Sequence, residues 1–389
     1  MLDGIRIVEF ATYVAGPAAC GLLADYGAEV VKVETRHGDP MRQFFASVGR
    51  DDAQNRVFET DNRGKKSIVI DIATEEGAAE MRALLRTADV FVTNARPASL
   101  ARAGLDWESL RAIKPDLIFA GFTGFGAEGP EADKPGFDIT AFWARTGLCS
   151  LATAKGGEPA QLRTGIGDHM AALGLLSGVL GALYHRAVTG EGQKIETSLI
   201  RMGFYAGASE QAVQLQLGRL ASTKPRREAV NPINNFFQTS DGRWFVTVPR
   251  QGRDGDWPRL ARAAGLNELV GDPRFDGFRN RRANQGELMD LVDAAFGAMD
   301  FDTAAAALDR EDMIWGPVLS VAQATADPQA RAAGCFAEVE DDAGERFEVI
   351  AGPIDYGAMP RRAFRCAPSV GEHGDEIRAG LNSMLAEGA

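Results

Sequence analysis

Cysteine and histidine are both scarce in this chain of 389 residues, which has four of each. Cys20, Cys149, Cys335 and Cys366 lie far apart and form no CxxC pair. Neither a zinc-binding spacing nor a local redox motif is therefore present, and we expect no bound metal. Reduced thiols are the expected state of such a set, which favours a cytoplasmic protein.

Long apolar runs and an excess of positive charge are also missing. Residues 1–6 lack the apolar core of a signal peptide. The nearest approach to a membrane span, residues 170–183, is too short and too rich in small side chains. The formal net charge of −12 argues against nucleic acid or a membrane surface as partner. We therefore expect a small-molecule ligand, and an anionic one would need a local basic pocket.

Strand and helix patterns alternate over the first half of the chain. Residues 5–10 and 29–34 are predicted as buried strands around a helix at 17–26, which has proline in its first turn. Further strands are predicted at 68–71, 90–93, 117–122 and 194–198, and further helices at 74–88, 106–113 and 169–187. This alternation predicts an α/β fold with a mostly parallel sheet covered by helices on both faces.

The length of the chain predicts more than one core. After residue 229 the pattern changes to a hairpin with an Asp241-Gly242 turn, followed by helices. The predicted organisation is a large domain from residues 1–204 and 326–389, a linker at 205–229 and a smaller α+β domain at 230–325.

The first strand–helix–strand unit argues against a dinucleotide site, although Glu34 ends its second strand. The loop at 10–17 lacks the G-x-G-x-x-G pattern that such a site requires. No G-x-S-x-G elbow of a serine hydrolase is present either.

Asp168 is the candidate catalytic residue. It stands before a helix rich in alanine and glycine, whose larger side chains recur at steps of three and four from Met170 to Leu183. One interpretation is a helix N-cap, which stabilises by ~1 kcal/mol. The other is a nucleophilic carboxylate at a helix N-terminus, where N–H groups stabilise an oxyanion. The spacing alone leaves both open.

Basic residues gather near predicted strand ends in the first hundred positions. Ligands of parallel sheets bind at such ends. The set is therefore either a solvated surface or a pocket for a phosphate-bearing ligand. Its members are Arg36, Arg42, Arg63, Lys65, Lys66, Arg96 and Arg102.

Several short motifs occur in a fixed order along the chain. They are Val14–Pro17, Gly27–Glu34, Asn62–Ser67, Asn94–Pro97, Gly121–Gly126 with Gly129-Pro130, Gly167-Asp168, Thr189–Gln193 and Ala367–His373. This set resembles the family III CoA-transferases, which include carnitine, formyl-CoA and bile-acid CoA-transferases. The resemblance covers nearly the whole chain.

The resemblance implies a function for Asp168. In that family the matching aspartate attacks the thioester of a donor acyl-CoA, which gives a mixed anhydride, and CoA then returns to give an aspartyl-CoA thioester. An acceptor carboxylic acid reverses these steps. Coenzyme A, as acyl-CoA, is thus the expected substrate. The positions that match CoA contacts are Val14, Ala15, Arg36, Lys65, Asn94, Ala95, Arg96 and Arg102. The resemblance also implies a Rossmann-like large domain built from both chain ends and an interlocked homodimer.

Two departures from relatives narrow the function. Formyl-CoA transferases carry four consecutive glycines where residues 231–235 stand here, which puts oxalate and formate in doubt and favours carnitine, bile acids, or 2-hydroxy and aryl acids. The α-methylacyl-CoA racemases share the fold but place a histidine where this chain has Phe137, before Asp138. Both residues are expected beside the substrate, yet Phe137 cannot carry a proton. A racemase or isomerase, and an acyl-CoA-binding protein without catalysis, are the alternatives.

Overall fold

The computed structural model describes residues 1–50, 55–250, 255–341, 343–358 and 364–387. The chain forms two compact units. The large unit comprises residues 1–149, 160–220 and 333–389, and the small unit comprises residues 150–159 and 221–332. The division differs from the expected one in three segments. Residues 205–229, expected as linker, are divided between the large unit (205–220) and the small unit (221–229). Residues 150–159 and 326–332, both expected in the large domain, belong to the small unit.

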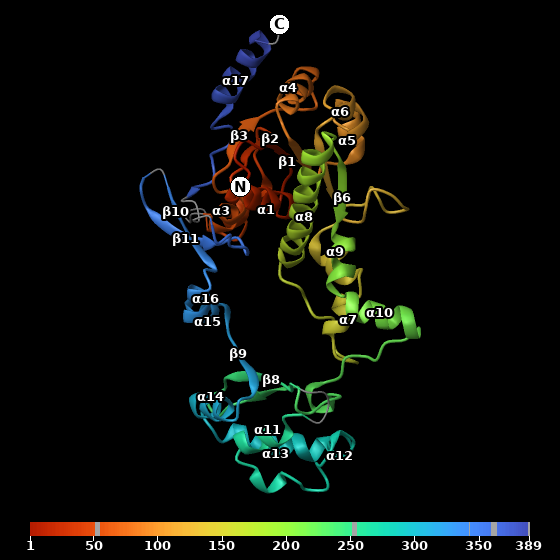
Figure 1. The fold of residues 1–389 in the computed structure, drawn as a ribbon, viewed down its shortest axis with the longest axis vertical. Coiled ribbons are helices and arrows are strands. Elements are labelled where there is room, and N and C mark those ends of the chain that lie inside the picture. The colour runs from red at the N-terminus through yellow and green to blue at the C-terminus, as the bar shows by residue number, and fades with distance from the viewer. Residues whose placement is uncertain (51–54, 251–254, 342, 359–363, 388–389) are drawn as a thin grey trace. The chain divides into compact units, whose positions relative to one another are not determined.

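A six-stranded sheet forms the centre of the large unit (Figure 1). Its strands are β1 (Arg6–Phe10), β2 (Glu29–Glu34), β3 (Lys66–Val69), β4 (Val90–Thr93), β5 (Ile118–Thr123) and β6 (Lys194–Ser198). Every neighbouring pair is parallel, and the order is β3-β2-β1-β4-β5-β6. That is the order of a doubly wound, Rossmann-like sheet. The predicted α/β fold with a mostly parallel sheet is therefore confirmed.

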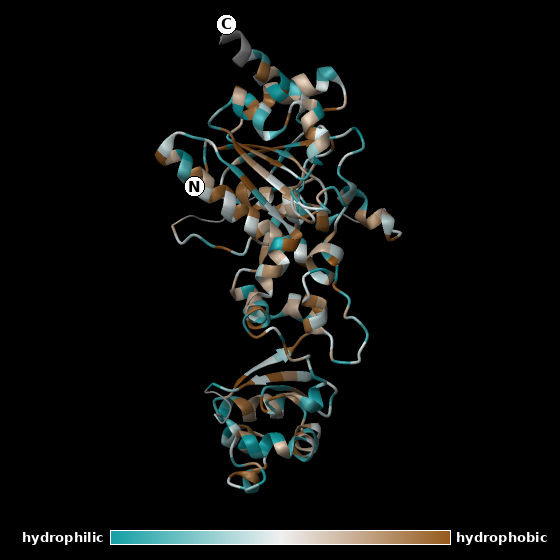
Figure 2. Ribbon diagram, turned by 90° about the vertical axis from the view of Figure 1, so that its right-hand side faces the viewer, coloured by the Kyte–Doolittle hydropathy of each residue, from teal (hydrophilic) through white to brown (hydrophobic). Residues whose placement is uncertain are grey.

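Helices cover both faces of this sheet, which explains why its central strands are apolar on both sides (Figure 2). Ile7 and Val8 are consecutive in β1 and face two different apolar cores, because side chains alternate along a strand. The core around Ile7 includes α1 (Ala15–Asp25) and α8 (Ile166–Thr189). The core around Val8 includes α4 (Glu75–Arg86), α5 (Pro97–Ala103), α6 (Trp107–Ile113) and α17 (Gly374–Glu387).

Helix α8 is longer than the helix predicted at 169–187. Its 24 residues are long and apolar enough to cross a membrane, and it is the one helix in the described ranges that meets this criterion. One face, with Ala171, Leu175 and Val179, is buried in the core that α8 shares with α1 and the sheet. This packing accounts for the apolar character of that face.

The large unit contains further elements outside this sheet. They are η1 (Pro40–Gln43), α2 (Phe44–Ser47), α3 (Arg56–Asn62), η2 (Asp138–Ala144), α9 (Leu199–Ala206), α10 (Ala208–Leu217), and a second sheet of β10 (Phe336–Glu340), β11 (Arg346–Ile350) and β12 (Phe364–Arg365). Helix α7 (Leu148–Ala152) spans the boundary between the units.

The small unit has a three-stranded antiparallel sheet of β7 (Asn235–Gln238), β8 (Trp244–Val248) and β9 (Ile314–Val318). The predicted hairpin at Asp241-Gly242 is confirmed. Strand β9 was not predicted, because Pro317 within it argues against a strand. It forms nevertheless because it lies at the edge of the sheet, where proline is tolerated. The helices of this unit are η3 (Arg226–Glu228), α11 (Trp257–Ala263), η4 (Asn267–Leu269), α12 (Phe278–Ala283), α13 (Gln285–Gly297), α14 (Phe301–Arg310), α15 (Val321–Ala326) and α16 (Pro328–Ala332).

Candidate active site

Asp168 lies in the first turn of α8 and does not cap it. The N-cap is Gly165, so Asp168 is the third residue of the helix, and the N-cap interpretation is wrong. The N–H group of Gly165 donates instead to Oδ2 of Asp138, 2.7 Å away. The Asp168 side chain is thus not needed to satisfy the start of the helix.

Gly167 allows the start of α8 to lie against η2. A Cβ atom at this position would be 2.7 Å from the Phe142 ring and 2.9 Å from Cβ of Asp138. Any larger residue would therefore push the two elements apart. The glycine of the Gly167-Asp168 motif fixes where the aspartate stands.

The Asp168 side chain faces a cavity of about 300 Å³. Within the described part of the chain, no hydrogen bond or ion pair reaches its carboxylate. Burial, and to a smaller extent the nearby Asp138 carboxylate, raise the pKa of Asp168 to about 7, while His169 acts in the opposite direction. A carboxylate without a partner, in a cavity, is available to a ligand.

Four of the predicted CoA-contacting residues line this cavity together with Asp168. They are Ala15, Asn94, Ala95 and Arg96. The side chain of Asn94 is fixed by two hydrogen bonds to the backbone of Thr12, of 3.1 and 2.8 Å. Among the described residues, Arg96 has no ion-pair partner, so its guanidinium is available to an anion.

Val14 lies next to the cavity, as the N-cap of α1. No side chain caps this helix, and its third residue, Pro17, has no N–H group. The N–H groups at Val14 and Ala15 have no acceptor in the described ranges. They are donors that a ligand in this region can use.

The two residues expected beside the substrate are placed differently. Phe137 lines the cavity and is 52% exposed. Asp138 is buried, and its two oxygens accept hydrogen bonds from the N–H groups of Gly165 and Ile139. Its role in the structure is to hold the start of α8.

Two of the predicted phosphate contacts lie away from this cavity. Arg36 is exposed, and its Nε contacts His37 Nε2 at 3.0 Å. Arg102 is exposed in the last turn of α5.

Lys65, the residue before β3, is buried in an ionic network with residues of β1 and β2. Its Nζ donates to Glu9 (2.6 Å), to the carbonyl of Pro17 (2.9 Å) and to Asn62 (2.9 Å). A direct contact between Lys65 and a phosphate would break all three bonds. We therefore leave Lys65 out of the ligand site.

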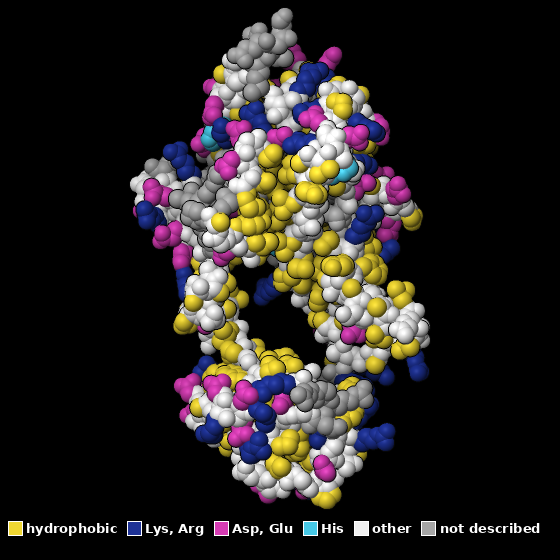
Figure 3. Space-filling model, viewed as in Figure 1, with side chains coloured by type: hydrophobic (Ala, Val, Ile, Leu, Met, Phe, Trp, Pro, Cys, Tyr) yellow, Lys and Arg dark blue, Asp and Glu magenta, His cyan; other side chains and the backbone are white. Residues whose placement is uncertain are grey.

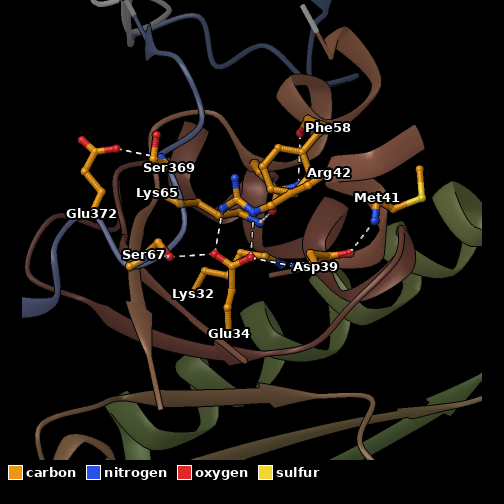
Figure 4. Close-up of polar contacts among 12 residues, drawn as sticks. Lys32, Glu34, Asp39, Met41, Arg42, Phe58, Lys65, Ser67, Ser369 and Glu372 are labelled. Atoms are coloured by element: carbon orange, nitrogen blue, oxygen red, sulfur yellow. Dashed lines mark hydrogen bonds and ion pairs between the residues drawn. The ribbon is translucent and has the colours of Figure 1, made fainter. Parts of the chain in front are cut away.

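Lys32 is the second buried cation of this network (Figure 4). Its Nζ lies 2.7 Å from Glu9 and 2.9 Å from Asp39, and it donates to the carbonyl of Ala11 at 3.1 Å. Burial alone would lower the pKa of Lys32, but the two carboxylates outweigh it and raise the pKa. Lys32 and Lys65 thus hold Ala11 and Pro17, the two ends of the segment that lines the Asp168 cavity.

Three neighbours of Asp168 were not identified from the sequence. Tyr13 and Lys134 line the cavity. His169 contacts the carbonyl of Gly165 at 2.8 Å and Asp61 at 3.2 Å, and the hydrogen bond to Asp61 is the main cause that raises its pKa to about 9. Lys134 could have been predicted as a ligand contact, because it is a cation in the Gly- and Pro-rich loop that follows strand β5.

A second cavity of about 370 Å³ adjoins the first. The two share the lining residues Ala95, Pro97, Phe122 and Thr123. The second is also lined by Trp107 and Arg201. Together they provide room for an elongated ligand with an anionic part.

Comparison with known proteins agrees with this geometry. The model of CoA-transferase family III matches residues 2–374. A cinnamoyl-CoA:phenyllactate CoA-transferase of Clostridium sporogenes is 38% identical over 72% of this chain and 68% of its own length. A (R)-2-hydroxy-4-methylpentanoate CoA-transferase of Clostridioides difficile is 30% identical over 98% of this chain and 95% of its own.

A solved structure supports the same assignment. The crystal structure of a CaiB/BaiF family protein from Brucella suis superposes with a TM-score of 0.85, at 32% identity, over 98% of this chain and 99% of that protein. With the parallel sheet, the carboxylate cavity and the family match over nearly all of its length, the chain belongs to CoA-transferase family III and is a CoA-transferase.

Proposed function

We propose that Asp168 carries the acyl group and then CoA during transfer between two carboxylic acids. Its carboxylate attacks the carbonyl carbon of the donor thioester, the C–S bond breaks, and CoA leaves as thiolate. The thiolate then attacks the aspartyl carbonyl of the anhydride, which releases the donor acid and leaves an aspartyl-CoA thioester. The acceptor carboxylate repeats these two steps in reverse. No proton is gained or lost overall.

The observation that carries this proposal is the free state of the Asp168 carboxylate. It faces a cavity, has no partner in the described part of the chain and lies at the start of a 24-residue helix. A pKa of about 7 means that a substantial part of it is ionised, and therefore nucleophilic, at neutral pH. The positive end of the helix favours the charged form as well.

The residues around Asp168 support a place for CoA. We propose that the pantetheine arm runs along Asn94 and Ala95 and that Arg96 binds a phosphate, with Lys134 as a second cation. The free N–H groups at Val14 and Ala15 are donors for the thioester oxygen. Arg36 and Arg102 stay proposals from the family resemblance.

We propose that the enzyme is a homodimer. A hollow of about 670 Å³ lies between α1, α3 and α8, and its lining is mainly apolar. Figure 3 shows hydrophobic side chains gathered on this face of the large unit. On α8 and the α9–α10 segment, large apolar residues are exposed: Tyr184, Val188, Tyr205, Leu215 and Leu217. Exposed patches of this kind indicate a protein contact. Light scattering on the purified protein should give twice the 41.6 kDa chain mass, and a monomer at all concentrations would reject the dimer.

The proposed location is the cytoplasm. The structure shows no disulfide among the four cysteines, which all lie in its described part, in agreement with a reducing compartment.

Hydroxylamine trapping tests the role of Asp168. The enzyme is incubated with acyl-CoA and then with hydroxylamine, which converts an aspartyl thioester into a hydroxamate that mass spectrometry locates on a peptide. We expect modification at Asp168 alone and loss of transfer by about a thousandfold in Asp168→Asn. Asp302→Asn is the matched control, since Asp302 is almost fully exposed on the small unit. An unmodified Asp168 peptide, or an active Asp168→Asn enzyme, rejects the proposal.

The two alternatives are separated by isotope experiments. A racemase would exchange the α-proton of its acyl-CoA with deuterated solvent, and Phe137 offers no group to carry that proton. A binding protein without catalysis would hold acyl-CoA but exchange no label between acyl-CoA and free acid. We expect no deuterium uptake and rapid label exchange.

A further inference from the structure

Tyr13 has a backbone conformation that bulky residues rarely adopt. Its φ is 67°, and the other described non-glycine residues with positive φ are both aspartates. The left-handed region is unfavourable for a side chain of this size. Such a residue persists only where its surroundings hold it, and residues of this kind cluster at functional sites.

Dedicated contacts hold Tyr13 in place. Its N–H group donates to Oδ1 of Asp39 at 3.1 Å. Asp39 is 1% exposed, and its other oxygen lies 2.9 Å from Nζ of Lys32, in a pair whose side chains are fully buried (Figure 4). The preceding residue, Thr12, is fixed by both hydrogen bonds to Asn94. The conformation of Tyr13 is thus maintained by a hydrogen bond to a buried side chain, Asp39.

This conformation places the Tyr13 ring against Phe137. The ring centroids are 5.4 Å apart and the planes are at 87°, an edge-to-face arrangement. Both side chains line the cavity that contains Asp168. They are 41% and 52% exposed, so aromatic surface is available to a ligand.

An acyl group bound at Asp168 would meet these rings. A planar apolar group loses water on contact with them, which favours binding. A group with a second carboxylate would have to lose its hydration beside the rings, which opposes binding unless a cation pairs with it. Arg96 and Lys134 are the cations that line this cavity. An ion pair between one of them and the second carboxylate of a dicarboxylic acyl group is therefore the competing outcome.

We propose that Tyr13, together with Phe137, is a specificity-determining residue that selects acyl groups with an aryl or other flat apolar part, and that Asp39 positions Tyr13 for this task. The inference rests on the proposed function, because it takes Asp168 as the point where the acyl group is held. It adds a substrate class and two residues to that function.

Equilibrium binding of two non-reactive CoA thioethers tests the proposal without any transfer step. One carries a 3-phenylpropyl group on sulfur and the other a 3-carboxypropyl group of similar length. Titration calorimetry of the full-length protein should show at least about tenfold tighter binding of the phenylpropyl thioether. Tighter binding of the carboxypropyl thioether would overturn the proposal in favour of a dicarboxylate site.

Variants assign the preference to Tyr13. In Tyr13→Gly the preference should fall to about threefold or less, and folding should be maintained because glycine tolerates this conformation. Tyr13→Phe keeps the ring and should keep the preference. An unchanged preference in Tyr13→Gly, or an equal loss in Tyr13→Phe, would contradict the role of the ring.

Asp39 variants test its positioning role. Asp39→Asn retains an oxygen for the Tyr13 N–H group and should retain most of the preference, whereas Asp39→Ala should lose it. If Asp39→Ala does not fold, Asp39→Asn is compared with Tyr13→Gly instead. A loss of the phenylpropyl preference in Asp39→Asn as large as that in Tyr13→Gly would contradict positioning through this hydrogen bond. The binding assay uses thioethers that do not react, so its result does not depend on CoA transfer. An enzyme that transfers no CoA would reject the proposed function, whereas a missing phenylpropyl preference would reject only the role of Tyr13.

Discussion

Replacing Asp168 by Asn should abolish transfer and yet stabilise the protein above neutral pH. The Asp168 carboxylate is partly buried and has no partner among the described residues, so its charged form is unfavourable in the folded state. An amide of the same shape carries no charge. A catalytic residue that is kept in an energetically unfavourable, charged state is expected to behave in this way, since its replacement raises stability and lowers activity.

The magnitude follows from the pKa. A rise from 3.8 in the unfolded chain to about 7 in the folded one corresponds to roughly 4 kcal/mol, at 1.36 kcal/mol per pKa unit. Because the folded pKa is the higher one, the folded state binds the proton more tightly. The stabilisation from this group is complete below about pH 4 and decreases as the pH rises to about 7. Solvent relaxation reduces the effect, so we expect about 1–3 kcal/mol.

Chemical denaturation of both proteins at pH 4.5, 6 and 8 measures this difference. Asp168→Asn does not titrate at this position, so the difference between the two unfolding free energies isolates Asp168. We expect the variant to gain relative to the wild type as the pH rises and the gain to level off above about pH 7. A difference that is constant with pH, or a variant that is less stable at pH 8, would refute the reasoning about this carboxylate.

Two further substitutions test the surroundings of the site. Gly167→Ala should destabilise the protein by about 1–3 kcal/mol in thermal unfolding and reduce transfer, because the new methyl group meets the Phe142 ring. Gly181→Ala is the control in the same helix. A Cβ at Gly181 has no atom within 4 Å, so this variant should be neutral or stabilising. Lys65→Met should destabilise by roughly 3–5 kcal/mol because it leaves Glu9 with one cation fewer, whereas Lys66→Met, which breaks partly exposed pairs, should change stability by less than about 1 kcal/mol. Equal effects of both members of either pair would contradict the corresponding contact.

The alternation of strands and helices was enough to predict the large sheet, because buried parallel strands leave apolar runs such as those at 90–93 and 118–122. The edge strand β9 was not predictable in this way, since Pro317 and Gly316 are poor strand formers and pairing with β8 decides their conformation. Long-range pairing of this kind has no signal in a local window.

The site was predictable only in part, for a related reason. Asn94, Ala95 and Arg96 follow directly on a strand, and the carboxyl ends of parallel strands meet at one edge. Whether a lysine near such an edge is free or buried depends on distant partners. Lys65 pairs with Glu9 across 56 positions, which no local pattern reveals. The φ of Tyr13 likewise depends on Asp39 and is invisible in its own sequence neighbourhood.

The central claim is that an oxygen atom of the acceptor acid passes through the Asp168 carboxylate. The experiment is a single turnover with an acceptor acid whose carboxylate carries heavy oxygen. The acid attacks the aspartyl-CoA thioester and forms a mixed anhydride with Asp168. The CoA thiolate then attacks the acceptor carbonyl of this anhydride and leaves as acyl-CoA, so the bridging heavy oxygen stays on the aspartate. Mass spectrometry of the peptide that contains Asp168 should show this single heavy oxygen in the wild type and none in Asp168→Asn. Formation of the product acyl-CoA by the wild type without any label on that peptide would contradict the account.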